Sequence, residues 1–329
     1  ESERELTMKA IQISEFGDAD QLKYVDVPDP VAGPGAVLVE VKAAGVNFAD
    51  IYSRKGQYPG PDLPRILGQE GAGIVKALGE GVTGFAVGDA VAWSGIPQAY
   101  AELAVVPAAR LIKMPAGVDP QVGAAALLQG MTAHYLCHST YPVKPGDRVL
   151  IHAGAGGVGL LLIQMVKRLG GYVYTTVSTP AKAALAREAG ADEVILYSDV
   201  DFAEEIKRAT NGEGVHVVYD AVGATTFDQS IASLKHRGYM VLYGQASGPV
   251  PPVALSVLNA GSFFLTRPTL VDYAVTREEL EQRSGDVLRW IASGELKLRV
   301  EHVFPLAQAA DAHRALEGRA TTGKVVLVP

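Results

Sequence analysis

Residues 149–159 constrain the fold of this 329-residue chain most strongly, because they read Val-Leu-Ile-His-Ala-Gly-Ala-Gly-Gly-Val-Gly. Gly154, Gly156 and Gly159 satisfy the pattern G-x-G-x-x-G between an apolar strand and an apolar helix over 158–169. The first glycine permits a tight turn, the second lets backbone approach a pyrophosphate, and the third lets helix and strand pack closely. The N–H groups at the helix start then suit phosphate. The sequence therefore predicts a dinucleotide-binding unit rather than a glycine-rich turn without a ligand.

The segment around this turn alternates between strand-like and helical runs. The strand-like runs cover 148–152, 172–177, 193–196, 215–219, 239–243 and 262–265. A helix over 181–189 is opened by Ser178, Thr179 and Pro180 and closed by Gly190. Because strands that alternate with helices form parallel sheets, we expect a doubly wound α/β domain here.

The first third of the chain has short strand-like runs separated by Pro and Gly, as in a partly closed barrel or sandwich. These runs cover 9–13, 22–27, 37–41, 71–77, 89–92 and 101–106. After residue 268, the sequence pattern predicts a helix over 277–293, a strand over 298–303, a helix over 306–317 and a strand over 324–328. This tail is too short for a third domain, so we expect it to complete the first one. The predicted domains are 8–125 with 268–329, and 126–267.

Composition excludes several classes of function. The net charge of -7 and the lack of a dense Lys/Arg block argue against nucleic acid as a partner. The chain has no apolar run of 18 residues, so the sequence predicts no membrane span. Residues 1–7 are polar and unlike a signal peptide, and the fold-like pattern begins at Met8. Cys137 is the only cysteine, which excludes an intrachain disulfide and a multi-cysteine metal site, and fits a reducing cytoplasm.

The strand after the glycine-rich turn ends at Val177, where an NAD-preferring site usually places Asp or Glu to hold the ribose hydroxyls. No acid follows here, since residues 178–182 read Ser-Thr-Pro-Ala-Lys. Ser178 and Lys182 would instead suit a 2′-phosphate, although a helix cap and a solvated lysine remain the alternatives. The missing acid and the added cation agree, so the sequence favours NADPH over NADH.

A helix over 121–138 brings His134, Cys137 and His138 to helical spacing, with the two histidines at i and i+4. Neither a fourth ligand nor the glutamate of an H-E-x-x-H motif is present. We therefore interpret this segment as a packed helix and predict no metal.

Several segments together resemble the medium-chain dehydrogenase/reductase superfamily, in particular its quinone oxidoreductase branch, which includes zeta-crystallin. They extend across Met8–Pro329 and comprise 44–50, 67–73, 153–159, 217–223, 266–268 and 319–323. The resemblance implies an α/β protein with a GroES-like β-rich catalytic domain and a Rossmann domain that binds NADPH.

Zinc alcohol dehydrogenases of this superfamily have a catalytic cysteine where Asn47 stands and a histidine where Gln69 stands. The four-cysteine lobe for structural zinc is missing too. Amide oxygens replace thiolate and imidazole poorly at zinc, so the resemblance implies a site without a Lewis acid. An electron-poor quinone needs only a hydride and hydrogen-bond donors for its developing oxyanion, whereas alcohol oxidation needs more help.

The resemblance also implies roles for individual residues. Asn47 and Tyr52 are expected to hydrogen-bond the substrate carbonyl or the nicotinamide ribose, with an ordinary core or surface aromatic as the alternative for Tyr52. The expected cofactor contacts are Thr132, Gly154, Gly156, Gly157, Val158, Gly159, Ser178, Lys182, Tyr197, Ala221, Val222, Tyr243, Gln245, Arg267 and Arg319. The alternative for each arginine is a surface ion pair, and Gln245 departs from the asparagine frequent in the family.

The expected activity is NADPH-dependent reduction of quinones without zinc. Reduction of an enone or alkenal double bond, and a weakly catalytic NADPH-binding protein with an RNA-binding or structural role, remain alternatives. An NADP-dependent alcohol dehydrogenase fits the missing zinc ligands poorly. The apolar run 261–265 predicts an edge strand, and the resemblance implies a homodimer formed through it.

Overall fold

The computed structural model describes residues 6–329, which divide into two compact units. The β-rich unit comprises residues 6–128 and 274–329, and the Rossmann unit comprises residues 129–273. The unit boundaries differ by a few residues from the expected domains, whose functional assignment stays a prediction. Of the expected polar start, residues 1–5 lie outside the described part, and strand β1 (Thr7–Ile13) begins two residues earlier than the predicted run 9–13.

The Rossmann unit is built on one six-stranded sheet, and all of its strand pairs are parallel. Its strands are β9 (Arg148–Ile151), β10 (Tyr172–Val177), β11 (Glu193–Leu196), β12 (Val215–Asp220), β13 (Leu234–Leu242) and β14 (Phe264–Thr266). The spatial order β11-β10-β9-β12-β13-β14 is the 3-2-1-4-5-6 order of a doubly wound fold. The predicted α/β fold is therefore confirmed.

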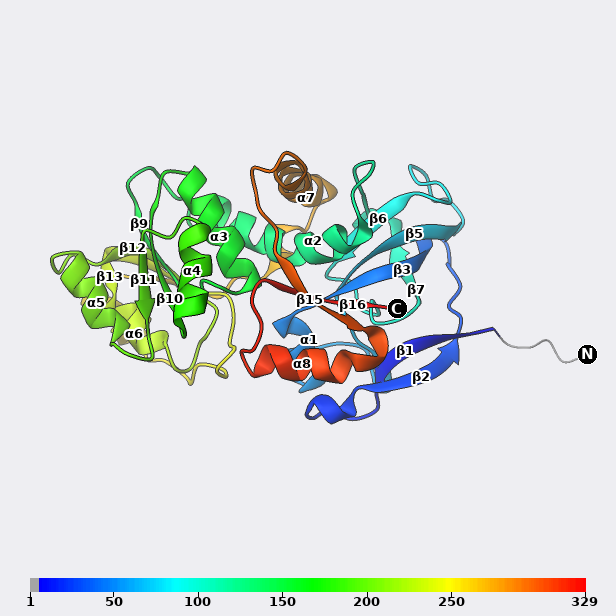
Figure 1. Cartoon of the computed structure of the whole chain (residues 1–329), viewed down its shortest axis with the longest axis horizontal. Coiled ribbons are helices and arrows are strands. Elements are labelled where there is room, and N and C mark those ends of the chain that lie inside the picture. Colours follow the sequence, from blue (N-terminus) through cyan, green and yellow to red (C-terminus); the bar gives the residue numbers. More distant parts are fainter. Residues whose placement is uncertain (1–5) are drawn as a thin grey trace, which may run out of the picture. The chain divides into compact units, whose positions relative to one another are not determined.

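Four helices connect these strands: α3 (Gly157–Arg168), α4 (Pro180–Glu188), α5 (Phe202–Ala209) and α6 (Phe227–Ala232). Helices α3 and α4 pack against each other and against β10 (Figure 1). Apolar side chains of α5 and α6 join the sheet in one buried cluster, which includes Leu150, Tyr174, Phe202, Ile206, Val218, Phe227 and Ile231. The Thr179 hydroxyl accepts a hydrogen bond from Lys182 N and Pro180 opens α4, as the cap signals predict.

The helix expected over 121–138 is shorter than its pattern. Helix α2 (Pro120–Tyr135) is regular, and a π-helical turn follows over Leu136–Thr140. The Tyr219 hydroxyl, on β12, lies 3.1 Å from the Leu136 carbonyl oxygen and 3.2 Å from that of Tyr141. This side chain satisfies backbone acceptors where the ordinary helical pattern is lost, which sequence periodicity does not reveal. Among residues 6–329, no helix has the length and apolarity needed to cross a membrane.

The β-rich unit holds two sheets. The three-stranded sheet has the order β2-β1-β4, with β2 (Lys23–Pro28) and β4 (Arg65–Ile66). The seven-stranded sheet has the order β15-β16-β3-β5-β6-β8, with β15 (Val300–Pro305) and β16 (Lys324–Val328) from the end of the chain, and β7 also pairs with β3. Its strands up to residue 113 are β3 (Ala36–Val46), β5 (Glu70–Leu78), β6 (Ala90–Ser94), β7 (Leu103–Pro107) and β8 (Ile112–Lys113). Strand β3 is thus the centre of the unit, pairing with three others.

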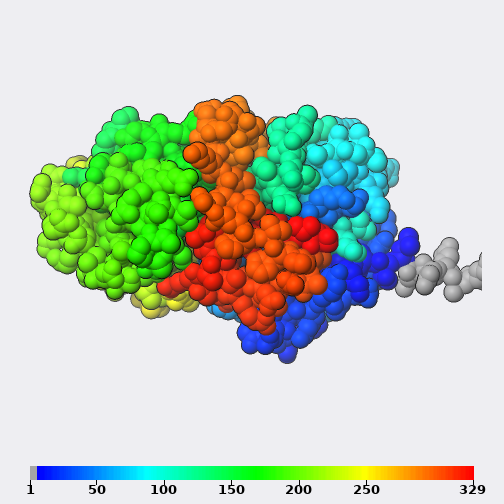
Figure 2. Space-filling view, in the orientation of Figure 1, coloured from blue at the N-terminus to red at the C-terminus, as the bar shows by residue number. Residues whose placement is uncertain are grey.

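The C-terminal segment returns to this sheet. It consists of α7 (Arg277–Ala292), β15 (Val300–Pro305), α8 (Ala309–Glu317) and β16 (Lys324–Val328). Strand β16 pairs antiparallel with β3, with Val325 opposite Val46. Figure 2 shows the red C-terminal segment against the blue N-terminal one, where Arg314 of α8 forms an ion pair with Asp20. This return places Lys324 beside the end of β3.

Substitution of Gly159 tests the close packing of α3 on the preceding strand. A Cβ at Gly159 would lie 2.2 Å from the Ala153 carbonyl oxygen, whereas one at Gly285 in α7 meets no atom within 4 Å. We expect Gly159→Ala to lower the free energy of unfolding by about 1–3 kcal/mol, because backbone must shift. The control Gly285→Ala should raise it by about 0.5–1 kcal/mol. Urea unfolding followed by circular dichroism measures both, and equal effects would contradict the packing argument.

Candidate active site

In the β-rich unit, Asn47 stands between the end of β3 and the start of α1 (Phe48–Arg54). Its backbone N–H donates to Asp50 Oδ2 at 2.9 Å, which closes the first turn of the helix. Asp50 Oδ1 accepts the backbone N–H of Gln69 at 3.0 Å. The Asp50 carboxyl therefore holds together the two segments in which the zinc dehydrogenases carry metal ligands.

A buried ion pair lies against the Asn47 side chain. Lys324 Nζ lies 2.6 Å from Glu70 Oε2 and donates to Asn47 Oδ1 at 2.7 Å. Asn47 Nδ2 donates to the same Glu70 oxygen at 2.9 Å. The side chains of Lys324 and Glu70 are both fully buried, and Asn47 is 3% exposed. Sequence reasoning assigned no role to Glu70 or Lys324, since a lysine at a strand start usually lies in solvent.

A chain of hydrogen bonds supports α1. Arg54 donates to His313 Nδ1 at 3.1 Å, so this nitrogen accepts and Nε2 carries the proton. His313 Nε2 then lies 3.1 Å from the Tyr100 hydroxyl, which donates to Asp50 Oδ2 at 3.1 Å. Burial lowers the pKa of His313 to about 3 and raises that of Asp50 to about 7. The neutral histidine is the form that this arrangement requires.

Tyr52, the other expected contact, lies in α1 and is 6% exposed. Its ring lies against those of Phe48 and Tyr58. Gln69 Nε2 donates to Ser53 Oγ at 3.2 Å, so the amide at the second zinc-ligand position is engaged within the unit. Asn47 caps α1 and Tyr52 lies within the same helix, whereas their contacts to a substrate stay predictions.

The glycine-rich turn of the Rossmann unit has little room for side chains. A Cβ at Gly154 would lie 2.1 Å from Thr175 Oγ1, and one at Gly157 1.9 Å from Gln129 Oε1. Gly156 is the N-cap of α3, followed by Gly157, Val158 and Gly159 in its first turn. Gln129 Oε1 is buried there without a hydrogen-bond partner. Close backbone, a helix start and an unsatisfied acceptor fit a bound dinucleotide that presents phosphates and donors.

A buried polar network joins the ends of β9 and β12. His152 Nδ1 lies 2.8 Å from Thr176 Oγ1, and His152 Nε2 lies 2.9 Å from Ser230 Oγ. Ser230 donates to Asp220 Oδ2 at 2.9 Å, and Asp220 Oδ1 accepts the backbone N–H of Val222 at 2.8 Å. Burial lowers the pKa of His152. This network fixes the loop after β12 relative to the glycine-rich turn, and the sequence signalled it only through a histidine directly before that turn.

The remaining predicted cofactor residues fall into three groups. At the ends of β10 and β11, Ser198 Oγ donates to the Ser178 carbonyl oxygen at 3.1 Å, and Tyr197 is 40% exposed. The loops after β12 and β13 adjoin, since Ala246 N donates to the Ala221 carbonyl oxygen at 3.1 Å. Of the other predicted residues, Thr132 is buried, Lys182, Val222, Tyr243 and Gln245 are half-buried, and Arg267 and Arg319 are exposed. Arg267 belongs to the Rossmann unit and Arg319 to the β-rich unit.

The histidines of α2 and its π-helical turn contact each other. The rings of His134 and His138 stack with centroids 4.3 Å apart, and His138 Nδ1 lies 3.2 Å from Cys137 Sγ. Burial raises the pKa of the Cys137 thiol well above its usual range, which opposes metal binding as a thiolate. Within residues 6–329, no group of three or more His, Cys, Asp and Glu side chains is arranged to hold a metal ion.

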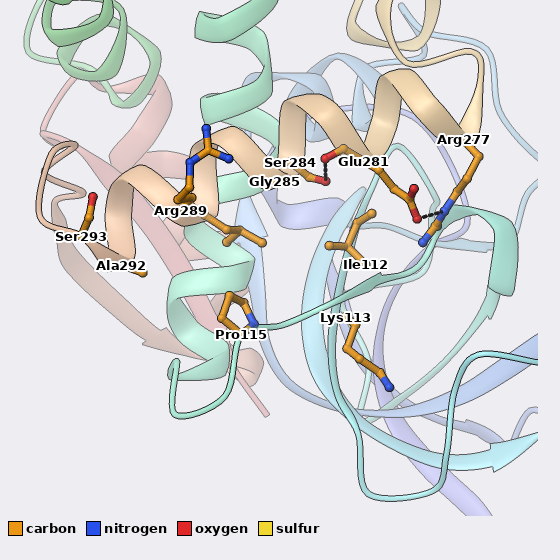
Figure 3. A pocket seen from close by; sticks show the side chains of 11 residues that line it. Ile112, Lys113, Pro115, Arg277, Glu281, Ser284, Gly285, Arg289, Ala292 and Ser293 are labelled. Atoms are coloured by element: carbon orange, nitrogen blue, oxygen red, sulfur yellow. Dashed lines mark hydrogen bonds and ion pairs between the residues drawn. The ribbon is translucent and has the colours of Figure 1, made fainter.

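A surface pocket of about 690 Å³ in the β-rich unit lies apart from every predicted site residue. Figure 3 shows it between α7 and the segment of Ile112 and Pro115. Its cations are already paired, with Arg277 2.7 Å from Glu281 and Arg289 2.6 Å from Asp286. Nothing in this pocket therefore points to a ligand.

Comparison with known proteins finds a family match in each unit, and the second match extends past Tyr273 into α7 of the β-rich unit. Residues 33–116 match the alcohol dehydrogenase GroES-like domain, and residues 157–293 match the zinc-binding dehydrogenase family. A quinone oxidoreductase of Pseudomonas aeruginosa is 44% identical over 98% of this chain and 99% of its own length. The chain belongs to the quinone oxidoreductase family. The resemblance inferred from the sequence is thereby confirmed.

Two further relatives bear on what this family does. The crystal structure of Escherichia coli quinone oxidoreductase complexed with NADPH matches with a TM-score of 0.95 and 41% identity, over 98% of this chain and 100% of that one. A 2-haloacrylate reductase from a Burkholderia species is 41% identical over 98% of this chain and 99% of its own length. These two relatives are thus named for different acceptors, although both are oxidoreductases.

The neutral state of His313 makes the stability of the β-rich unit sensitive to acid. Below pH 6.5 the unfolded chain binds a proton at this residue and the folded chain does not, so stability falls with pH down to about 3. A glutamine can accept from Arg54 and donate to Tyr100 without titrating. We expect His313→Gln to cost about 1 kcal/mol at pH 7 and to lose less stability than wild type between pH 6.5 and 4.

Urea unfolding at pH 7, 5.5 and 4 measures this effect, and replacing the exposed His236 by Gln is the control. The control should follow the wild-type profile. A His313→Gln variant with the same acid sensitivity as wild type would show that His313 is not held neutral in the fold.

Proposed function

We propose that this protein is an NADPH-dependent quinone oxidoreductase that works without zinc. The observation that carries the proposal is the buried ammonium of Lys324, 2.7 Å from Asn47 Oδ1 at a position where zinc dehydrogenases have a ligand. A cation already occupies this environment, and amide side chains stand at both ligand positions, so the residues present do not fit zinc. The family membership supplies the reaction class.

The Rossmann unit supports the cofactor assignment. The turn at Gly154–Gly159 and the start of α3 would hold the pyrophosphate, and Gln129 Oε1 would accept a hydrogen bond. Ser178, Lys182 and Tyr197 are the residues proposed to hold the 2′-phosphate. When bound, NADPH supplies a hydride, and the other expected cofactor residues would fix its orientation.

The β-rich unit supplies the proposed substrate contacts. Asn47 and Tyr52 are the candidates for hydrogen bonding to the acceptor carbonyl, whose oxygen gains charge as hydride is delivered. The acceptor is a small quinone or another conjugated carbonyl compound.

A second candidate function is reduction of an activated carbon–carbon double bond. It is favoured by the similarity to a 2-haloacrylate reductase, whose identity to this chain equals that of the E. coli quinone oxidoreductase. Both reactions deliver hydride to a conjugated system beside an oxyanion donor. An RNA-binding or structural role has less support, because the chain is acidic.

The assembly is proposed to be a cytoplasmic homodimer formed through β14. This strand ends the six-stranded sheet, and Phe264 and Leu265 on it are 51% and 38% exposed. The ring of Phe264 stacks on Tyr239 at 4.5 Å, which holds it in place at the edge. An apolar edge strand with free backbone groups is suited to pairing with a second copy.

Stopped-flow measurement of NADPH oxidation against a panel of quinones, enones and 2-haloacrylates tests the function. We expect turnover with quinones, a strong preference for NADPH over NADH, and full activity after dialysis against a chelator. Zinc-dependent turnover would overturn the proposal. Turnover confined to enones or haloacrylates would favour the second candidate, and tight NADPH binding without turnover would favour a non-catalytic role.

Substitution of Lys182 tests the proposed contact to the 2′-phosphate. We expect Lys182→Ala to weaken NADPH binding about tenfold, since one charge-assisted hydrogen bond is lost, and to leave NADH binding unchanged. Fluorescence titration of both cofactors measures this difference. The control is Lys207→Ala on the exposed side of α5, which should change neither affinity. An equal loss for NADPH and NADH would show that Lys182 serves the fold rather than the phosphate.

A further inference from the structure

The Asn47 carboxamide has two chemically different ends, and the two charges beside it distinguish them. Its oxygen accepts from Lys324 Nζ at 2.7 Å, and its nitrogen donates to Glu70 Oε2 at 2.9 Å. Rotating the amide by 180° would set an N–H group against the ammonium and a carbonyl oxygen against the carboxylate. Both contacts would then be repulsive at full burial, so only one orientation is compatible with this ion pair.

The Glu70 carboxylate is itself fixed in place. Its other oxygen, Oε1, accepts the backbone N–H of Leu128 at 2.7 Å. A Cβ at Gly45 would lie 2.3 Å from Oε2, so glycine leaves the room that the carboxylate occupies. Lys324 is fixed by the pairing of β16 with β3. The pair is therefore held by backbone on both sides.

One proton of the Asn47 amide is left for another acceptor. The second Nδ2–H has the Gly45 carbonyl oxygen at 3.5 Å, which is the outer limit of a hydrogen bond. The amide oxygen is occupied by Lys324. Because its oxygen already accepts from a full positive charge, Asn47 is better suited to act toward a substrate as a donor than as an acceptor.

We propose that Glu70 and Lys324 are positioning residues, which orient the Asn47 carboxamide so that one Nδ2–H is presented to the carbonyl oxygen of the acceptor. This inference rests on the proposed function, in which Asn47 contacts that oxygen. The ammonium also polarises the amide through its oxygen, which strengthens the remaining N–H as a donor. Neither charged group needs to touch the substrate.

The main variant is the neutral pair Glu70→Gln/Lys324→Met. It removes both charges together, so no unpaired charge is left buried, and the glutamine introduced at position 70 accommodates either orientation of the Asn47 amide. We expect the melting temperature and the Kd for NADPH to stay near wild type, and kcat with a quinone to fall about tenfold through partial loss of an oriented donor. The control Lys113→Met/Asp89→Asn neutralises a partly exposed ion pair and should keep wild-type kcat.

A comparison in the Asn47→Ala background separates positioning from general structural support. If the pair acts through Asn47, the neutral pair should lower kcat no further once Asn47 is replaced by alanine. A wild-type kcat for the neutral pair would overturn the proposal. So would a fall in kcat of equal size in both backgrounds, because the pair would then act on the fold.

A spectroscopic measurement tests the orientation without turnover. The chain has three asparagines, Asn47, Asn211 and Asn259, so selective ¹⁵N labelling gives three side-chain NH₂ groups, and Asn47→Ala assigns one of them. In the wild-type protein without cofactor, we expect two widely separated proton shifts for Asn47 and slow hydrogen exchange. In the neutral pair, exchange should speed up at least about tenfold, because the oriented contacts that protect the amide are weakened.

These readouts also distinguish this inference from the proposed function. Fast exchange at Asn47 in the wild-type protein would overturn the positioning role even if the neutral pair fails to fold. A wild-type protein that reduces no quinone would overturn the proposed function, and the Asn47 signals would still decide whether the ion pair fixes the amide.

Discussion

The pairing of β16 with β3 is the constraint on which the β-rich unit depends. It brings Lys324, close to the end of the chain, against Asn47 and Glu70, which lie in the first quarter of it. Two full charges at this depth are tolerable only because they face each other and an amide that satisfies both. The position of α1, and with it Asn47 and Tyr52, follows from an interaction that spans most of the sequence.

Around this ion pair, further polar side chains form hydrogen bonds that fix the orientation of α1. Asp50 connects the helix start to the Gln69 segment, and Tyr100 and His313 connect Asp50 to Arg54. Each group in this chain has one donor–acceptor assignment, which leaves little freedom to move. A site built in this way is organised before any substrate arrives, which is what the proposed reaction through hydrogen-bond donors would require.

In the Rossmann unit, a different set of interactions holds the candidate binding residues in place. The carboxyl ends of the parallel strands lie at the same end of the sheet, so the turns after β9 and β12 meet there. The network of His152, Ser230 and Asp220 joins these turns. Backbone N–H groups at the start of α3 remain for phosphate. In the proposed function the two units therefore differ in kind, since one would offer backbone to an anion and the other an oriented side-chain donor.

The sequence by itself determined the doubly wound sheet and the glycine-rich turn, because local periodicity and spacing encode these features, and its resemblance to a known family identified the amides at the zinc-ligand positions. It left the engagement of Glu70 and Lys324 unseen, and it extended the helix at 121–138 through a segment that becomes a π-helical turn. Only tertiary structure decided these points. A lysine separated from its carboxylate partner by 254 residues leaves no local pattern, and the Tyr219 hydroxyl satisfies carbonyls of a helix far from it in sequence.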